Sequence, residues 1–184
     1  MIDLARLAPH LERKLLAASL PQRFRLFALL LEGASYEPGR ENIFATDCSG
    51  TLAWPLYCMG YNIRLTAAEF FAQVFTHHVP IGDIKDFGEH CYAVFYERAG
   101  AISHVAPIVG RGVLLDAVSR DQPVMLKAAE PVLNWYRAAG YSFYFREIDW
   151  ACARKLADHG PRHWEREADA MLLEILGFNA VGVS

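Results

Sequence analysis

The chain has 184 residues and a formal net charge of −3; 53% of its residues are hydrophobic and 21% are charged. This composition excludes an intrinsically disordered chain. No run of Lys and Arg exceeds two residues, which argues against a nucleic-acid groove or an anionic membrane surface as partner. The apolar runs are short, for example 26–31, whereas a membrane helix needs about 18 residues. The length predicts one domain over 1–184, and the short apolar runs predict that it has no membrane span.

Four cysteines are present, at spacings of 10, 33 and 61 residues, and none forms a CxxC pair. The spacing argues against a thiolate zinc cage, and nothing else indicates a secreted disulfide scaffold. The first thirty residues do not resemble a signal peptide, because Asp3, Pro9 and Glu12 interrupt any apolar core. We expect a cytoplasmic protein, or one exported without a cleaved leader.

Helical patterns occupy the first part of the chain. An apolar stripe of leucines predicts a helix over 3–18, and Pro21 opens a second helix that ends near Gly33. A third helix is expected over 49–60, directly after Cys48. A capping box that begins at Thr66 starts a fourth helix, which extends to about residue 75. The side chains predicted to line the buried face of the second helix are Phe24, Phe27, Leu30 and Leu31.

The periodicity then changes from helical to extended. Strands are predicted at 91–96, 102–109, 113–118 and 141–148, with a short helix at 131–139 and loops at 36–46 and 77–88. Pro161 and Gly177 bracket a last helix over 161–177. Helices followed by strands predict an α+β fold in which a helix packs on an antiparallel sheet.

The segment Asp47-Cys48-Ser49-Gly50 places a cysteine where a loop enters a helix. Unpaired N–H groups at a helix start stabilise a thiolate and can bind an oxyanion. The alternative is a buried, inert cysteine, which is the commoner state of this residue.

A hairpin around Gly110-Arg111-Gly112 supplies the partners of such a cysteine. A three-residue loop places residues whose numbers sum to 222 opposite each other, so that His104 and Asp116 share one face, diagonally about 7–8 Å apart. A two-residue turn would send them to opposite faces. A carboxylate that orients an imidazole beside a thiol is typical of cysteine hydrolases. The alternatives are a half-buried strand histidine and a strand-end carboxylate near Arg111 or Arg120.

Other histidines do not predict a metal site. His77, His78 and His90 have no fixed helical spacing. Gly160-Pro161 breaks the helix between His159 and His163, so these two do not share a face. We therefore expect neither a metal nor a cofactor.

The order of a helix-borne cysteine, a strand histidine and a polar residue on the next strand resembles the NlpC-type cysteine peptidases, which are compact papain-like bacterial cell-wall hydrolases. The resemblance covers about 21–117 and implies a family-like core over about 21–150, with helices 3–18 and 161–177 as additions. The matching segments are Gly33-Ala34-Ser35-Tyr36, Thr46-Asp47-Cys48-Ser49-Gly50, Leu65-Thr66-Ala67-Ala68-Glu69, Gly82-Asp83, Ser103-His104-Val105 and Val109-Gly110-Arg111-Gly112.

The resemblance implies a role for each matching residue. Cys48 corresponds to the nucleophile and His104 to the base, while Asp116 occupies the position of a third polar residue that is more often histidine. Tyr36 matches a tyrosine that lines the cleft. Asp47 and Ser49 match positions that in some members hold the free amine of the substrate peptide.

The sequence predicts a single catalytic domain with a cysteine nucleophile. The resemblance implies a cysteine peptidase or amidase that cleaves the bond between D-γ-glutamate and the diamino acid of peptidoglycan stem peptides. The expected partner is a peptidoglycan-derived peptide, and the cellular context could be recycling, a phage tail or an injected toxin. Two alternatives stay open: an acyltransferase on the same scaffold, and an inactive module that binds a peptide or a protein partner.

Overall fold

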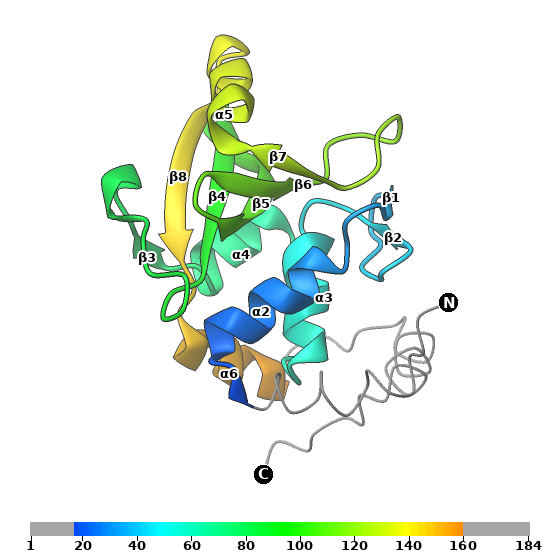
Figure 1. Cartoon of the computed structure of the whole chain (residues 1–184), viewed down its shortest axis with the longest axis vertical. Coiled ribbons are helices and arrows are strands. Elements are labelled where there is room, and N and C mark those ends of the chain that lie inside the picture. Colours follow the sequence, from blue (N-terminus) through cyan, green and yellow to red (C-terminus); the bar gives the residue numbers. More distant parts are fainter. Residues whose placement is uncertain (1–16, 160–184) are drawn as a thin grey trace.

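The computed structural model describes residues 17–159 (Figure 1). The predicted helix 161–177 lies outside the described residues, as does helix 3–18 apart from its last two positions. None of the helices between residues 17 and 159 combines the length and the apolar character that crossing a membrane requires.

Helix α2 (Leu20–Leu29) begins as predicted, near Pro21. Its start is fixed by a capping box, in which Ser19 and Gln22 each accept a hydrogen bond from the backbone N–H of the other. Three of the four side chains predicted on its buried face are buried, but Leu30 is 49% exposed. Leu30 and the buried Leu31 lie about 100° apart around a helix, so only one of the two can face the core.

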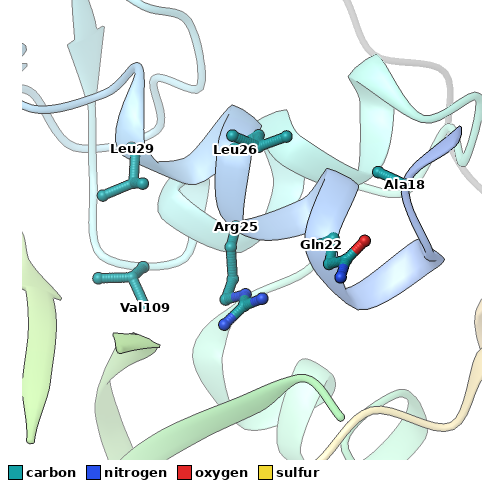
Figure 2. Close-up of a pocket in the computed structure, with 6 residues that line it drawn as sticks. All are labelled: Ala18, Gln22, Arg25, Leu26, Leu29 and Val109. Carbon is teal, nitrogen blue, oxygen red and sulfur yellow. The ribbon is translucent and has the colours of Figure 1, made fainter. Parts of the chain in front are cut away.

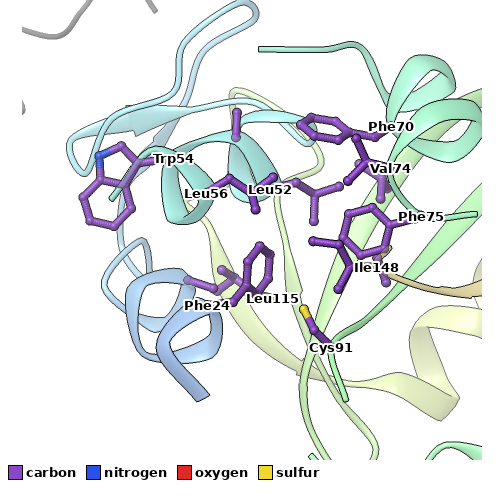
Figure 3. Close-up of a cluster of buried hydrophobic side chains, with 14 of the residues drawn as sticks. Phe24, Leu52, Trp54, Leu56, Phe70, Val74, Phe75, Cys91, Leu115 and Ile148 are labelled. Atoms are coloured by element: carbon purple, nitrogen blue, oxygen red, sulfur yellow. The ribbon is translucent and has the colours of Figure 1, made fainter. Parts of the chain in front are cut away.

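Two further helices pack with α2 on one face of the sheet: α3 (Gly50–Cys58) and α4 (Ala67–Gln73). The predicted capping box of α4 is present, with Thr66 and Glu69 as its two members. α3 is buried from residue 50 to residue 56. Figure 3 shows side chains of all three helices converging on Leu115 and Cys91 at the sheet.

The sheet has six antiparallel strands in the order β3-β8-β4-β5-β6-β7. Four of them match the predicted strands: β4 (Tyr92–Arg98), β5 (Ala101–Gly110), β6 (Val113–Asp116) and β8 (Ser142–Glu147). The predicted short helix is α5 (Ala129–Ala138). Alternate strand residues contribute to two hydrophobic cores, one beneath α2, α3 and α4 and one beneath α5.

Several short elements lie where the sequence predicted loop or nothing regular. The edge strands of the sheet are β3 (His77–His78) and β7 (Met125–Ala128), and β1 (Ser35–Tyr36) pairs in parallel with β2 (Ala45–Thr46). A 3₁₀ turn spans Ile81–Asp83. Helix α6 (Trp150–His159) follows β8, and Asp149 accepts hydrogen bonds from the N–H groups of Ala151 and Cys152 at its start.

The β5–β6 hairpin has the predicted register but not the predicted turn. Ile108 lies opposite Leu114, which agrees with the sum of 222, but Gly110 lies opposite Val113. The connection is therefore a two-residue turn, Arg111-Gly112, and the prediction of a three-residue loop is wrong. A β-bulge between Ile108 and Gly110 adds one residue to β5 and restores the register that the shorter turn would have shifted.

Candidate active site

Cys48 lies between β2 and α3, at the predicted junction of loop and helix, and is a partly exposed free thiol. It packs against the edge of the core beneath α3. Cys91, in contrast, is fully buried in that core, where burial raises the pKa of its thiol. The structure thus separates an accessible cysteine at a helix start from a structural one.

Asp47 holds the junction together through both of its carboxylate oxygens. Oδ1 accepts hydrogen bonds from the N–H of Gly50 at 2.7 Å and from the Ser49 hydroxyl at 2.9 Å. Oδ2 accepts one from the N–H of Gly39 at 2.7 Å and pairs with Arg64 Nη2 at 2.8 Å. Asp47 therefore caps α3, and four internal donors occupy its carboxylate.

Arg64 is a member of this cluster that the sequence did not reveal. Its Nε lies 2.7 Å from Glu41 Oε2, and its Nη1 donates to the Ser49 hydroxyl at 2.7 Å. The Glu41 side chain is fully buried and that of Arg64 is 18% exposed, so the guanidinium balances Glu41 and Asp47 in a site with little water. Arg64 follows a core isoleucine in a loop, and no local pattern distinguishes it from a solvated arginine.

The close packing at Gly50 leads to a prediction about stability. A Cβ at this position would overlap the Thr46 side chain and the backbone oxygen of Arg40. We expect Gly50→Ala to lower the free energy of unfolding by about 2–3 kcal/mol and the melting temperature by roughly 5–10 °C. Thermal unfolding followed by circular dichroism measures the effect. Gly82→Ala is the matched control, since a Cβ there meets nothing within 4 Å; equal melting temperatures for the two variants would contradict the prediction.

His104 and Asp116 lie on the same face of the hairpin, as predicted, and their side chains are in contact. The ring Nε2 lies 3.0 Å from Asp116 Oδ1, both side chains are buried, and Cys48 lies close enough to the ring to raise its pKa. Because Nε2 is used by Asp116, Nδ1 is the nitrogen available to the thiol. Burial alone would lower the pKa of His104, but the hydrogen bond with Asp116 and the proximity of Cys48 outweigh it and raise this pKa to about 9.

Asp116 has a second partner that the sequence analysis missed. Lys127, on the unpredicted strand β7, places its Nζ 3.1 Å from Asp116 Oδ2. Burial would raise the pKa of Asp116, but the hydrogen bond with His104 and the charge of Lys127 hold it below its usual value. The carboxylate is therefore ionised, with one cationic donor on each oxygen.

Aromatic rings enclose the imidazole. Tyr136 of α5 stacks on His104, with ring centroids 5.5 Å apart and an interplanar angle of 19°, and the ring of Tyr96 lies 5.0 Å away. Tyr96 is the direct β4 partner of His104, so strand pairing could have identified it. Tyr136 comes from α5, far beyond His104 along the chain, and left no such signal.

Tyr36, on β1, lies near the thiol. Burial raises the pKa of its hydroxyl, and the negative charges of Cys48 and Asp47 raise it further. The side chain is only partly buried.

A separate shallow pocket lies on the outer side of α2 (Figure 2). None of the candidate catalytic side chains lines it. The lining residues are Ala18, Gln22, Arg25, Leu26, Leu29 and Val109.

Comparison with known proteins identifies the architecture. The sequence matches no protein-family model and no curated protein. Among solved structures, NlpC2 from Trichomonas vaginalis aligns with 70% of this chain at a TM-score of 0.54 and 18% identity. The NlpC/p60 domain of peptidoglycan hydrolase SagA aligns with 70% of this chain and 97% of its own length, at a TM-score of 0.50 and 19% identity.

The chain has the NlpC/p60 fold. The predicted α+β class and NlpC-type architecture are thereby confirmed. NlpC1 from Trichomonas vaginalis aligns with 68% of this chain at a TM-score of 0.52 and 18% identity. The alignments span 46% of the length of NlpC2 and 42% of that of NlpC1. Within its NlpC/p60 fold, this chain brings Cys48, His104 and Asp116 together.

Proposed function

We propose that this protein is a cysteine peptidase or amidase that hydrolyses an amide bond in a cell-wall peptide. The observation that carries the proposal is the placement of Cys48 beside His104, whose Nε2 lies 3.0 Å from Asp116 Oδ1. The fold adds support, because one structure with this architecture is named a peptidoglycan hydrolase.

The first chemical step is acylation of Cys48. The thiolate sulfur attacks the amide carbonyl carbon, and the carbonyl oxygen becomes an oxyanion. The N–H groups of Gly50 and Thr51 already donate to Asp47, which leaves those of Cys48 and Ser49 as the proposed oxyanion donors. The raised pKa of His104 keeps its ring protonated near neutral pH. Its Nδ1 proton passes to the leaving nitrogen as the C–N bond breaks.

The second step releases the product. The thioester on Cys48 is attacked by water, which gives a proton to Nδ1 of His104. The C–S bond then breaks, the acid product leaves, and the thiolate and imidazolium are restored. Asp116 holds Nε2 throughout, which keeps the tautomer and the orientation of the ring constant.

Product analysis on purified muropeptides tests this function. The proposal predicts two fragments whose masses sum to that of the parent plus one water, with the new ends on D-γ-glutamate and on the diamino acid. Two products whose masses sum to that of the parent plus an added amine, with the amine joined to the acyl fragment, would establish an acyltransferase instead. An intact muropeptide pool at high enzyme concentration would reject both enzyme proposals.

The filled carboxylate of Asp47 changes the expectation for the substrate end. An ammonium of the substrate would have to displace Arg64 or a backbone donor from Asp47. We therefore propose that Asp47 and Ser49 act by holding the junction, and that Tyr36 lines the substrate cleft.

This proposal makes a prediction for the peptide L-Ala-γ-D-Glu-diaminopimelate. Acylation of its N-terminus should change kcat/KM by less than about threefold. Asp47→Asn should lower kcat/KM for both peptides equally and reduce the melting temperature, because an amide oxygen replaces only one of the two acceptors. Steady-state kinetics on the four combinations decides the matter. A large decrease in kcat/KM on acylation in the wild type that is absent in Asp47→Asn would instead show that Asp47 binds the ammonium of the substrate.

A further inference from the structure

Lys127 contacts the buried carboxylate that orients His104. Its Nζ lies 3.1 Å from Asp116 Oδ2, while His104 Nε2 lies 3.0 Å from Oδ1. The Asp116 side chain is 1% exposed and that of Lys127 is 24% exposed, so this ion pair is largely removed from water. A pair in such a place exerts a stronger field than a surface salt bridge.

The charge balance of the site depends on this lysine. During the proposed reaction His104 alternates between imidazolium and neutral imidazole. When it is neutral, Asp116 would be a buried carboxylate without a counter-charge, a state that carries a large desolvation cost. Lys127 supplies a positive charge that stays in place in both states.

We propose that Lys127 is a positioning residue for the Cys48–His104 pair: it keeps Asp116 ionised and directed at Nε2, and its charge sets the pH range in which the thiol is reactive. This inference rests on the proposed function only in taking Cys48 as the nucleophile. Its test uses the thiol itself and requires no substrate.

The other groups that face the pair do not supply this charge. They include the phenols of Tyr96 from β4, Tyr136 from α5 and Tyr36 from β1. Asp47, next to Cys48, is already paired with Arg64. Burial raises the pKa of each of these phenols, so all three stay neutral across the range in which His104 titrates. The leading charge effects on Asp116 come from His104 and Lys127.

The sign of the effect follows from the charge. Removing a cation destabilises the nearby thiolate and favours the imidazolium, so both the acidic and the basic inflection of Cys48 reactivity should move to higher pH. For a partly shielded charge at this range the expected shift is about 0.5–1 pH unit. A lysine that merely ties β6 to β7 would change stability and leave both inflections where they are.

The experiment measures the second-order rate of alkylation of Cys48 by iodoacetamide between about pH 4 and pH 10, with the label located by peptide mapping. Lys127→Met should show the upward shift, and Lys127→Arg should keep the wild-type profile. Lys127→Gln, which keeps an N–H donor but not the charge, should behave like Lys127→Met and serves as the second variant if the methionine variant does not fold. Lys155→Met is the matched control: the same charge is removed from an exposed position on α6, at the opposite end of the molecule from α5 (Figure 1).

The outcomes separate the two proposals. If Cys48 is reactive and the inflections of its alkylation rate are the same in Lys127→Met, Lys127→Gln and the wild type, the role of Lys127 alone is overturned. A shift of the inflections in Lys127→Arg as large as that in Lys127→Met would overturn it as well. A wild-type Cys48 that titrates like Cys58 and Cys152 would overturn the proposed function and this inference with it.

Discussion

Cys48→Ala is expected to lower kcat/KM on muropeptides by at least about 10³-fold, because no other group in the proposed mechanism can form the thioester. Cys48→Ser should lose as much, since His104 is arranged to pair with a thiolate and a hydroxyl stays protonated at neutral pH. Cys48 is partly exposed at the margin of the core, so the free energy of unfolding should change by about 1 kcal/mol or less in either variant.

Chromatographic quantification of muropeptide cleavage, together with thermal unfolding, checks this prediction. Cys58→Ala is the matched control, because it removes another partly exposed thiol at the far end of α3. Its activity should stay near that of the wild type. Full activity in Cys48→Ala would place the nucleophile elsewhere and contradict the mechanism.

His104→Ala and Asp116→Asn should separate the chemical role from the orienting role. The alanine variant loses the group that moves the proton, and kcat/KM should fall by about 10³-fold or more. The asparagine variant keeps an acceptor for Nε2, so its loss should be at least tenfold smaller. Asp116→Asn should also lower the free energy of unfolding by about 2 kcal/mol relative to the wild type, because it leaves the half-buried Lys127 facing a neutral amide.

Steady-state kinetics and urea unfolding of the two variants measure these effects. Asp116→Asn combined with Lys127→Met is the informative double variant, since removing both charges should recover part of the lost stability without recovering the orientation of His104. An Asp116→Asn activity loss as large as that of His104→Ala would contradict a purely orienting carboxylate.

The parts of the fold that local chemistry specifies could be predicted from the sequence. The capping box at Thr66 fixes the start of α4, Asp47 marks the start of α3, and the long strands carry enough apolar residues to be recognised. The hairpin register was predicted correctly for a reason that was only partly right. The turn is one residue shorter than predicted, and the bulge makes β5 one residue longer. The combined length of turn and bulge is constrained, because the apolar residues of the strand have to face the core.

The parts of the site that depend on long-range pairing could not be predicted. β7 has four residues and no clean alternation of burial, so Lys127 carried no sign of its contact with Asp116. Tyr136 reaches His104 only because α5 covers the second face of the sheet. These residues become neighbours through the order of the strands in the sheet, and the local patterns of a single sequence do not reveal that order.

A competition between the cysteines for a limiting amount of iodoacetamide at pH 7 tests the central claim most directly. The account predicts that Cys48 is labelled first, well ahead of the partly exposed Cys58 and Cys152, and that His104→Ala removes this lead. Cys91, buried in the core, should be labelled last. Labelling of Cys48 in the wild-type protein no faster than Cys58 and Cys152 would contradict an activated nucleophile at the start of α3.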